Sequence, residues 1–154
     1  MHARNARGPR WAVMTVWGVV NAVNLLQSVG FATRPVAPEV NEVAGWVMVA
    51  LAIPATAALV GFVRAGSGWR LIVGPAVYDL FIGFMLVVED WLAIEFRDPR
   101  RPEILIPYLV LFFGSIVLMG APMLRIDKRL WAVTAATSVL LLGSMVWALS
   151  RGVG

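Results

Sequence analysis

The sequence has no cysteine and only one histidine, His2, in its N-terminal tail. The absence of cysteine excludes disulfides, thiolate metal sites and thiol redox chemistry. A lone histidine in the tail cannot provide a set of buried metal ligands or a proton relay. A glycine-rich phosphate loop, a Gly-x-Ser-x-Gly elbow and a paired-histidine motif are also absent from the sequence. We therefore expect no metal and no cofactor, and we favour a protein that is not an enzyme.

Charge is scarce as well, because 14% of the 154 residues are charged and 60% are hydrophobic. A typical soluble domain is about 25% charged and about 45–50% apolar. A soluble chain of this composition would expose apolar patches that soluble monomers rarely tolerate. The net charge is +4, but the basic residues lie between apolar segments instead of clustering on a polar surface. The expected partner is therefore a lipid bilayer and not nucleic acid.

Five apolar runs have the length needed to cross the bilayer, which takes about 17–25 residues of helix. They are Trp11–Phe31, Val43–Val63, Leu71–Val88, Ile104–Leu124 and Leu130–Leu149. Lipid offers no partner to backbone polar groups, so each run is expected to be helical. The sequence predicts an all-α fold, a polytopic transmembrane helix bundle that forms a single domain over residues 1–154.

The basic residues also predict an orientation, because cytoplasmic loops carry an excess of Lys and Arg. With the N-terminus inside, the inside segments hold eight basic residues: Arg4, Arg7, Arg10, Arg64, Arg70, Arg125, Lys128 and Arg129. The outside segments hold five: Arg34, Arg97, Arg100, Arg101 and Arg151. We predict a multi-pass protein of the plasma (inner) membrane with its N-terminus in and its C-terminus out. The first span is expected to be retained, since Asn21, Asn24 and Gln27 interrupt the apolar core that a cleaved signal peptide needs.

The third span carries an acid, Asp79, near the middle of the predicted bilayer. A charged Asp at that depth costs about 2.5–3.5 kcal/mol on insertion scales, so such residues usually face the bundle interior. No basic residue lies at comparable depth in any span, and we expect Asp79 to be neutral and hydrogen-bonded. A regular helix would place Pro75, Gly83, Leu86 and Asp90 on the same face. This face predicts a polar stripe from the midplane to the outer surface.

The first span offers polar side chains that could complement this acid. Trp17, Asn21, Asn24 and Ser28 fall on one face, at spacings of four, three and four residues. Amides within a membrane must be satisfied, and hydrogen bonds between helices are the usual means. We predict that this face lies toward Asp79.

In the fourth span Tyr108 and Ser115 share a face, seven residues apart. Two interpretations of these polar residues stay open. In one, Asp79 is a proton or cation site in a pocket between spans one, three and four, with Asn21, Asn24 and Tyr108 contacting a ligand. In the other, the acid and the amides only fix how the helices pack.

The segment 89–97 contains acids among large apolar residues, which is typical of a short interfacial helix. Such a segment could form the rim of an entrance that binds metal ions or lipid headgroups, because carboxylates suit hard cations and Arg suits phosphate. The alternative is a solvated loop with internal ion pairs, which carry little energy.

The sequence therefore supports two hypotheses of different classes. The first is a membrane protein that binds or transports a small molecule or lipid through a polar intramembrane pocket formed by Asp79, Asn21, Asn24 and Tyr108. The second is a non-catalytic subunit or assembly factor whose spans pack against a partner protein or a second copy of the chain. An enzyme acting on lipids is a third alternative, but no nucleophile or base accompanies its candidate acids Asp79, Glu89 and Asp90.

Overall fold

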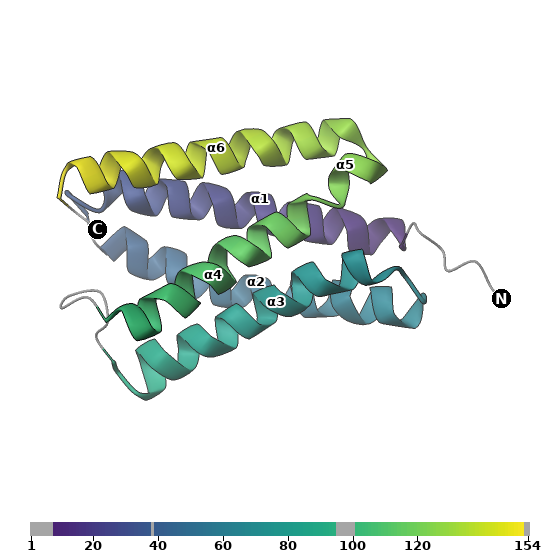
Figure 1. Cartoon of the computed structure of the whole chain (residues 1–154), viewed down its shortest axis with the longest axis horizontal. Helices are drawn as coiled ribbons and strands as arrows, with labels where there is room; N and C mark the ends of the chain where they lie inside the picture. The colour runs from purple at the N-terminus through teal and green to yellow at the C-terminus, as the bar shows by residue number, and fades with distance from the viewer. Residues whose placement is uncertain (1–7, 38, 95–100, 153–154) are drawn as a thin grey trace.

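The computed structural model describes residues 8–37, 39–94 and 101–152, and the regular structure in these ranges is helical. Figure 1 shows the helices running back and forth along one long axis. Their bounds are α1 (Arg10–Thr33), α2 (Glu39–Arg64), α3 (Trp69–Met85), α4 (Pro102–Gly120), α5 (Met123–Ile126) and α6 (Lys128–Ser150), with a π-helical segment, η1 (Leu86–Trp91), continuing α3.

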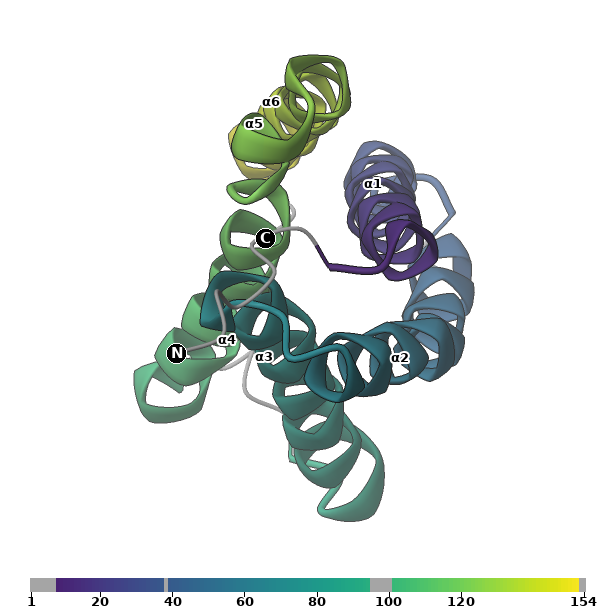
Figure 2. The same ribbon diagram turned by 90° about the vertical axis from the view of Figure 1, so that its right-hand side faces the viewer.

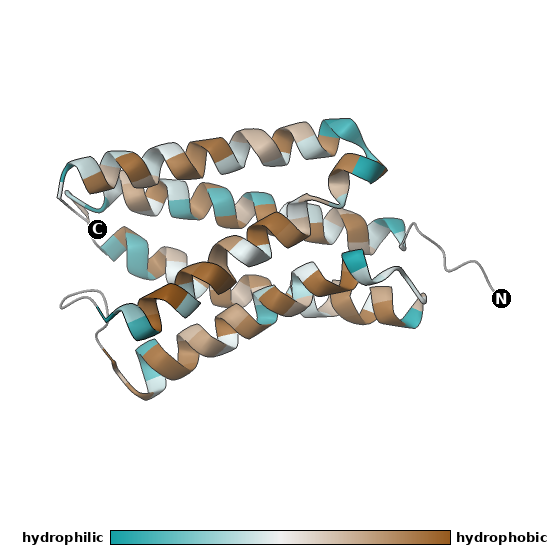
Figure 3. Cartoon of the chain, viewed as in Figure 1, coloured by the Kyte–Doolittle hydropathy of each residue, from teal (hydrophilic) through white to brown (hydrophobic). Residues whose placement is uncertain are grey.

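Within the described ranges, five helical segments are long and apolar enough to cross a membrane. They are Arg10–Thr33, Glu39–Arg64, Trp69–Trp91, Pro102–Ile126 and Lys128–Ser150. This confirms the prediction of an all-helical chain with five spans, and each span is slightly longer than its apolar run. In Figure 3 hydrophobic residues fill the middle of most helices, and hydrophilic residues gather at their ends. The chain therefore has the character of a multi-pass membrane protein.

Seen end-on, the spans form an open arc in the order α6, α1, α2, α3, α4 (Figure 2). Neighbours along the arc are in extensive contact, whereas α4 and α6, at its two ends, touch little and are joined through the short α5. The core includes buried side chains from every helix, among them the fully buried Val20 and Val23 of α1 and Tyr78 and Phe81 of α3. The Tyr78 hydroxyl donates to the Met48 carbonyl oxygen at 2.8 Å and so ties α3 to α2.

Gly74 allows α3 and α4 to approach each other at backbone distance. A Cβ atom at this position would lie 2.7 Å from the carbonyl oxygen of Leu118 and 2.8 Å from the amide nitrogen of Met119. Small residues at helix contacts permit this kind of close approach in membranes. At the far end of α2, Gly61 plays the same role against the ring of Trp11.

The two ends of the bundle differ in charge. At the Glu89 end, where α1, η1 and α6 finish, lie five acids, Glu39, Glu42, Glu89, Asp90 and Glu103, and three arginines, Arg34, Arg101 and Arg151. At the Lys128 end, where α2 and α5 finish, lie six basic residues, Arg10, Arg64, Arg70, Arg125, Lys128 and Arg129, and one acid, Asp127. The first and the last span, α1 and α6, begin and end such that the described chain enters the bundle at the Lys128 end and leaves it at the Glu89 end (Figure 1), as five spans require. Which end faces the cytoplasm stays a prediction.

The segment 89–97 differs from the predicted interfacial helix in the part that the structure describes. Glu89, Asp90 and Trp91 belong to the π-helical end of the third span. The helix ends at Trp91, and Ala93 has a left-handed φ of 47°. A residue in this conformation stops a right-handed helix. Residues 95–97 lie outside the described ranges.

Candidate functional site

The amide face of α1 lies against α6. The Trp17 indole Nε1 donates to the Leu130 carbonyl oxygen at 3.0 Å. The Asn21 amide Nδ2 donates to Thr134 Oγ1 at 3.1 Å, and its Oδ1 accepts from Thr137 Oγ1 at 2.8 Å. Asn21 and Thr134 are both buried. The stripe that the sequence shows is therefore a polar seam between the first and the last span.

Asn24 completes this seam one turn further along. Its Nδ2 donates to Thr137 Oγ1 and to Ser138 Oγ, both at 3.0 Å, and the side chain is fully buried. Ser28 Oγ donates back to the Asn24 carbonyl oxygen at 2.6 Å. The prediction that these amides face Asp79 is thus wrong. They face α6 because its Thr and Ser hydroxyls accept hydrogen bonds from both amide nitrogens and Thr137 donates to Asn21 Oδ1, whereas Asn24 Oδ1 is buried without a hydrogen-bond partner among the described residues.

Asp79 lies on a different side of the bundle, against α2. Thr56 Oγ1 donates to Asp79 Oδ2 at 2.9 Å. The acid is half-buried, Thr56 is exposed, and the adjacent Leu80 is 59% exposed. Asp79 Oδ1 is buried and has no hydrogen-bond partner within the described part of the chain. The acid is hydrogen-bonded, as expected, but it lies at the outer surface of the α2–α3 pair and not in a central pocket.

The remaining predicted residues are divided between the core and a cavity. Ser115 is fully buried, and its Oγ donates to the Phe112 carbonyl oxygen of its own helix at 2.7 Å. Tyr108 and Asp90 line a large cavity at the Glu89 end. The structure therefore brings Tyr108 and Asp90 together at the cavity and Asn21 and Asn24 together in the seam, while Asp79 and Ser115 lie apart from both pairs.

This cavity, which we call the Glu89 cavity, has a volume of about 640 Å³. Ligand pockets typically measure about 300–1,000 Å³. Its lining comes from all five spans: Gln27, Phe31, Arg34, Asn41, Glu42, Gly45, Trp46, Met48, Val49, Met85, Glu89, Asp90, Leu105, Tyr108, Leu109, Phe112, Phe113, Met145 and Leu149. Its walls are thus mostly apolar, with a few polar and charged side chains.

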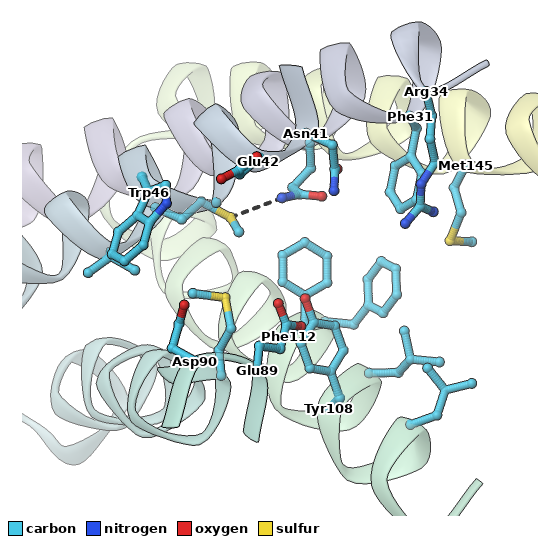
Figure 4. Close-up of a pocket in the computed structure, with 18 of the residues that line it drawn as sticks. Phe31, Arg34, Asn41, Glu42, Trp46, Glu89, Asp90, Tyr108, Phe112 and Met145 are labelled. Atoms are coloured by element: carbon cyan, nitrogen blue, oxygen red, sulfur yellow. Dashed lines mark hydrogen bonds between the residues drawn. The ribbon is translucent and has the colours of Figure 1, made fainter. Parts of the chain in front are cut away.

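The charged side chains approach the cavity from two facing walls. In Figure 4, Arg34 and Glu42 lie on the wall formed by α1 and α2, and Glu89, Asp90 and Tyr108 lie on the wall formed by η1 and α4. The lining contains three carboxylates and one guanidinium, so it carries an excess of acidic over basic side chains. Glu42 and Asp90 are exposed, whereas Arg34 and Glu89 are half-buried.

The π-helical segment places Glu89 and Asp90 in this wall. The Leu92 amide donates to the Val87 carbonyl oxygen at 2.9 Å, five residues back. Each residue added to a turn rotates the following side chains by roughly 100° relative to a regular α-helix. Asp90 therefore leaves the face of Asp79, on which the sequence predicts it. Such π-helical turns occur frequently at functional sites.

The deeper part of the cavity is aromatic. The Tyr108 ring packs edge-on against Phe81, with ring centroids 5.2 Å apart, and Phe112 contacts Phe113 at 5.0 Å. Gln27 donates to the sulfur of Met48 at 3.2 Å, the bond drawn in Figure 4. These contacts fix the shape of the wall below the charged rim.

A second, smaller space lies between α4 and α6, and we call it the α4–α6 groove. Its volume is about 230 Å³. It is lined by Phe113, Ile116, Val117, Gly120, Ala121, Trp131, Thr134, Ala135, Ser138, Leu141 and Leu142. The groove is the consequence of an open arc, because α4 and α6 make few contacts with each other.

The acids of the Glu89 cavity do not form a metal site. Within the described ranges, no three His, Cys, Asp or Glu side chains are grouped closely enough to hold a metal ion. The carboxylates therefore contribute negative charge to the cavity, and no coordination sphere is available from them.

Sequence reasoning missed most of the cavity, including Arg34, Glu42 and Trp46. The available signal was positional, because Arg34 and Glu42 flank the first loop and Glu89 and Asp90 end the third span at the same side. Loops at the same end of a helix bundle lie close together, so these four charged residues could have been predicted to lie near one another.

Comparisons with models of known protein families, with curated proteins and with solved structures returned no match.

Proposed function

We propose that this protein binds an amphiphilic small molecule or lipid with a positively charged head in the Glu89 cavity. The observation that carries the proposal is the cavity itself, about 640 Å³ in volume, with a charged mouth and aromatic walls. A large, mostly apolar pocket with a few convergent polar groups is the usual form of a small-molecule site. The gradient from charge to hydrocarbon along the cavity fits an amphiphile.

The excess of carboxylates supports a cationic head. Glu42 and Asp90 line the mouth from facing walls. A unit charge 4 Å from a carboxylate gains about 1 kcal/mol in bulk water and about 4 kcal/mol near a protein surface. Trp46, which is 55% exposed and also lines the cavity, offers an aromatic face to a quaternary ammonium group.

The proposed orientation places the mouth at the outer surface of the membrane. The Glu89 end carries most of the acids and the Lys128 end carries most of the basic residues, which is the distribution of an outer and an inner face. An amphiphile in the outer leaflet would then reach the cavity with its head at the level of the lipid headgroups.

The proposal is tested by measuring the binding of radiolabelled dodecyltrimethylammonium to the purified protein in lipid nanodiscs. We expect saturable binding. The double variant Glu42→Gln/Asp90→Asn should bind at least about tenfold more weakly, equivalent to about 1.4 kcal/mol.

The matched control is Glu39→Gln/Glu103→Gln. It removes two exposed acids from the same end of the bundle, and neither residue lines the cavity. Binding that does not saturate, or an equal loss in both double variants, would contradict the proposal. The first outcome denies a site, and the second reduces the effect to the overall charge of this end.

One observation favours the second candidate, a non-catalytic subunit or assembly factor. The hydrogen-bonded pair Thr56–Asp79 lies at the outer surface of α2 and α3, beside the exposed side chains of Ile53 and Leu80. A carboxyl group facing lipid is expensive, so a partner helix that covers it would stabilise the bundle. This function is supported if the Asp79→Leu variant is still folded and inserted in cells but no longer co-purifies with the larger complex that contains the unmodified protein.

A further inference from the structure

Phe113 lines both the Glu89 cavity and the α4–α6 groove. We propose that the two spaces form one binding path, in which the head of the amphiphile lies in the cavity and its hydrocarbon tail passes Phe113 into the groove. This inference rests on the proposed function and deepens it, because it names a long-chain ligand and a residue that determines its length.

The same faces of α4 and α6 line both spaces. On α4 the lining residues follow each other at helical spacing from Tyr108 through Phe112 to Ile116 and Gly120. On α6 the lining residues of the groove, Trp131, Ala135, Ser138 and Leu142, are followed by Met145 and Leu149 of the cavity. Residues three or four apart share one helix face. The groove therefore continues the cavity toward the Lys128 end.

The chemistry of the groove suits a tail and not a head. Thr134 and Ser138 contribute its hydroxyl groups, and both accept hydrogen bonds from the amides of Asn21 and Asn24. The other lining residues are aliphatic or aromatic, and no ionisable residue lines the groove. A hydrocarbon chain can enter this environment without leaving a polar group unsatisfied, whereas an ammonium group cannot.

Small residues create the width of the groove. Gly120, Ala121 and Ala135 line it, and a Cβ atom on Gly120 would lie 3.0 Å from Cγ2 of Thr134. Larger residues at these positions would close the space between α4 and α6. The groove is thus a specific product of these side chains as well as of the open arc.

Phe113 is suited to control passage between the two spaces. It is half-buried, whereas its neighbour Phe112 is 4% exposed and packs against Phe81 with ring centroids 5.4 Å apart. The Phe113 ring is therefore the one that can change in size without emptying the core. A smaller residue should ease the entry of a long tail, and a larger one should exclude it.

The test uses octyl- and hexadecyltrimethylammonium with a photoreactive diazirine at the chain end, bound to the full chain in nanodiscs and mapped by mass spectrometry. We expect the octyl probe to label residues of the Glu89 cavity. The hexadecyl probe should label the 131–142 stretch of α6. In Phe113→Trp the hexadecyl label should leave this stretch while the octyl label stays, and in Phe113→Ala it should increase there.

The matched control is Phe84→Trp, because Phe84 is also half-buried and lines neither space. Should Phe113→Trp fail to fold, Ala135→Phe fills the groove from its other wall. A hexadecyl label that is unchanged in these variants overturns the single path, while a competed octyl label leaves the proposed function intact. An octyl label that unlabelled probe does not displace denies the proposed function itself.

Discussion

Asp79 is an acidic residue on a surface that is otherwise apolar. It contacts Thr56 at 2.9 Å on a surface whose other side chains, Ile53 and Leu80, are apolar and exposed. A carboxyl group at this depth is far less costly when it is neutral and hydrogen-bonded than when it is charged. We therefore expect Asp79 to be protonated and within reach of a reagent dissolved in the lipid.

This environment predicts selective modification of Asp79 by a membrane-soluble carbodiimide. Such reagents react with protonated carboxyl groups that they reach through the hydrocarbon. We expect dicyclohexylcarbodiimide to label Asp79 in proteoliposomes, detected by mass spectrometry, and the label to disappear in Asp79→Asn. Asp90, which is exposed at the end of the bundle, should react instead with a water-soluble carbodiimide. Equal labelling of both acids by both reagents would contradict this assignment.

At the scale of helices, the contact of α1 with α6 depends on the seam of amides and hydroxyls. Asn24 donates two of the hydrogen bonds of this seam, to Thr137 and Ser138. Hydrogen bonds between membrane helices contribute on average about 0.6 kcal/mol and at most about 1.7 kcal/mol. We expect Asn24→Ala to lower the free energy of unfolding by about 0.6–1.7 kcal/mol for each bond lost, measured by steric trapping in bicelles.

Leu25→Ala serves as the comparison for Asn24→Ala. Leu25 is 46% exposed, whereas Asn24 is fully buried, so we expect truncation of Leu25 to remove mainly contacts with lipid. A loss of stability in Leu25→Ala that matches or exceeds the loss in Asn24→Ala would argue against the seam as the main contact between these spans.

The contact of α3 with α4 depends on the absence of a side chain at Gly74. A Cβ atom there would lie 2.7 Å from a backbone oxygen, which cannot move without shifting α4. Overpacking of this kind costs about 1–3 kcal/mol. We expect Gly74→Ala to lower the midpoint of thermal unfolding. Gly83→Ala in the same span should not, because nothing lies within 4 Å of a Cβ atom at Gly83.

For the whole molecule, the opposite charges of the two ends predict its topology. The Lys128 end should face the cytoplasm and the Glu89 end the outside, because basic residues are retained on the inside. Alkaline phosphatase fused after Gly154 should be active, and a fusion in the turn at Gly66, at the other end of the bundle, should be inactive. The reverse pattern would invert the bundle and place the mouth of the Glu89 cavity at the cytoplasmic surface.

Several features of this protein follow from the sequence alone. The lengths of five apolar runs determine five helices, because lipid leaves the backbone no other way to satisfy its hydrogen bonds. Helical spacing likewise determines that Trp17, Asn21, Asn24 and Ser28 share one face, and all four have hydrogen bonds in the structure. These properties are local, since each depends only on residues within one helix.

The neighbours of each face were decided only by the tertiary structure. Asn21 and Asn24 bind hydroxyls of α6 more than a hundred residues away, and Asp79 binds Thr56 of α2. Hydrophobicity cannot choose between such partners, because lipid tails are as apolar as neighbouring helices. Detailed packing makes the choice, through contacts such as that of Gly74 with the backbone of Leu118. The Glu89 cavity depends on the same packing and on a π-helical turn that interrupts the helical repeat, so the pattern of residues along the chain could not place it.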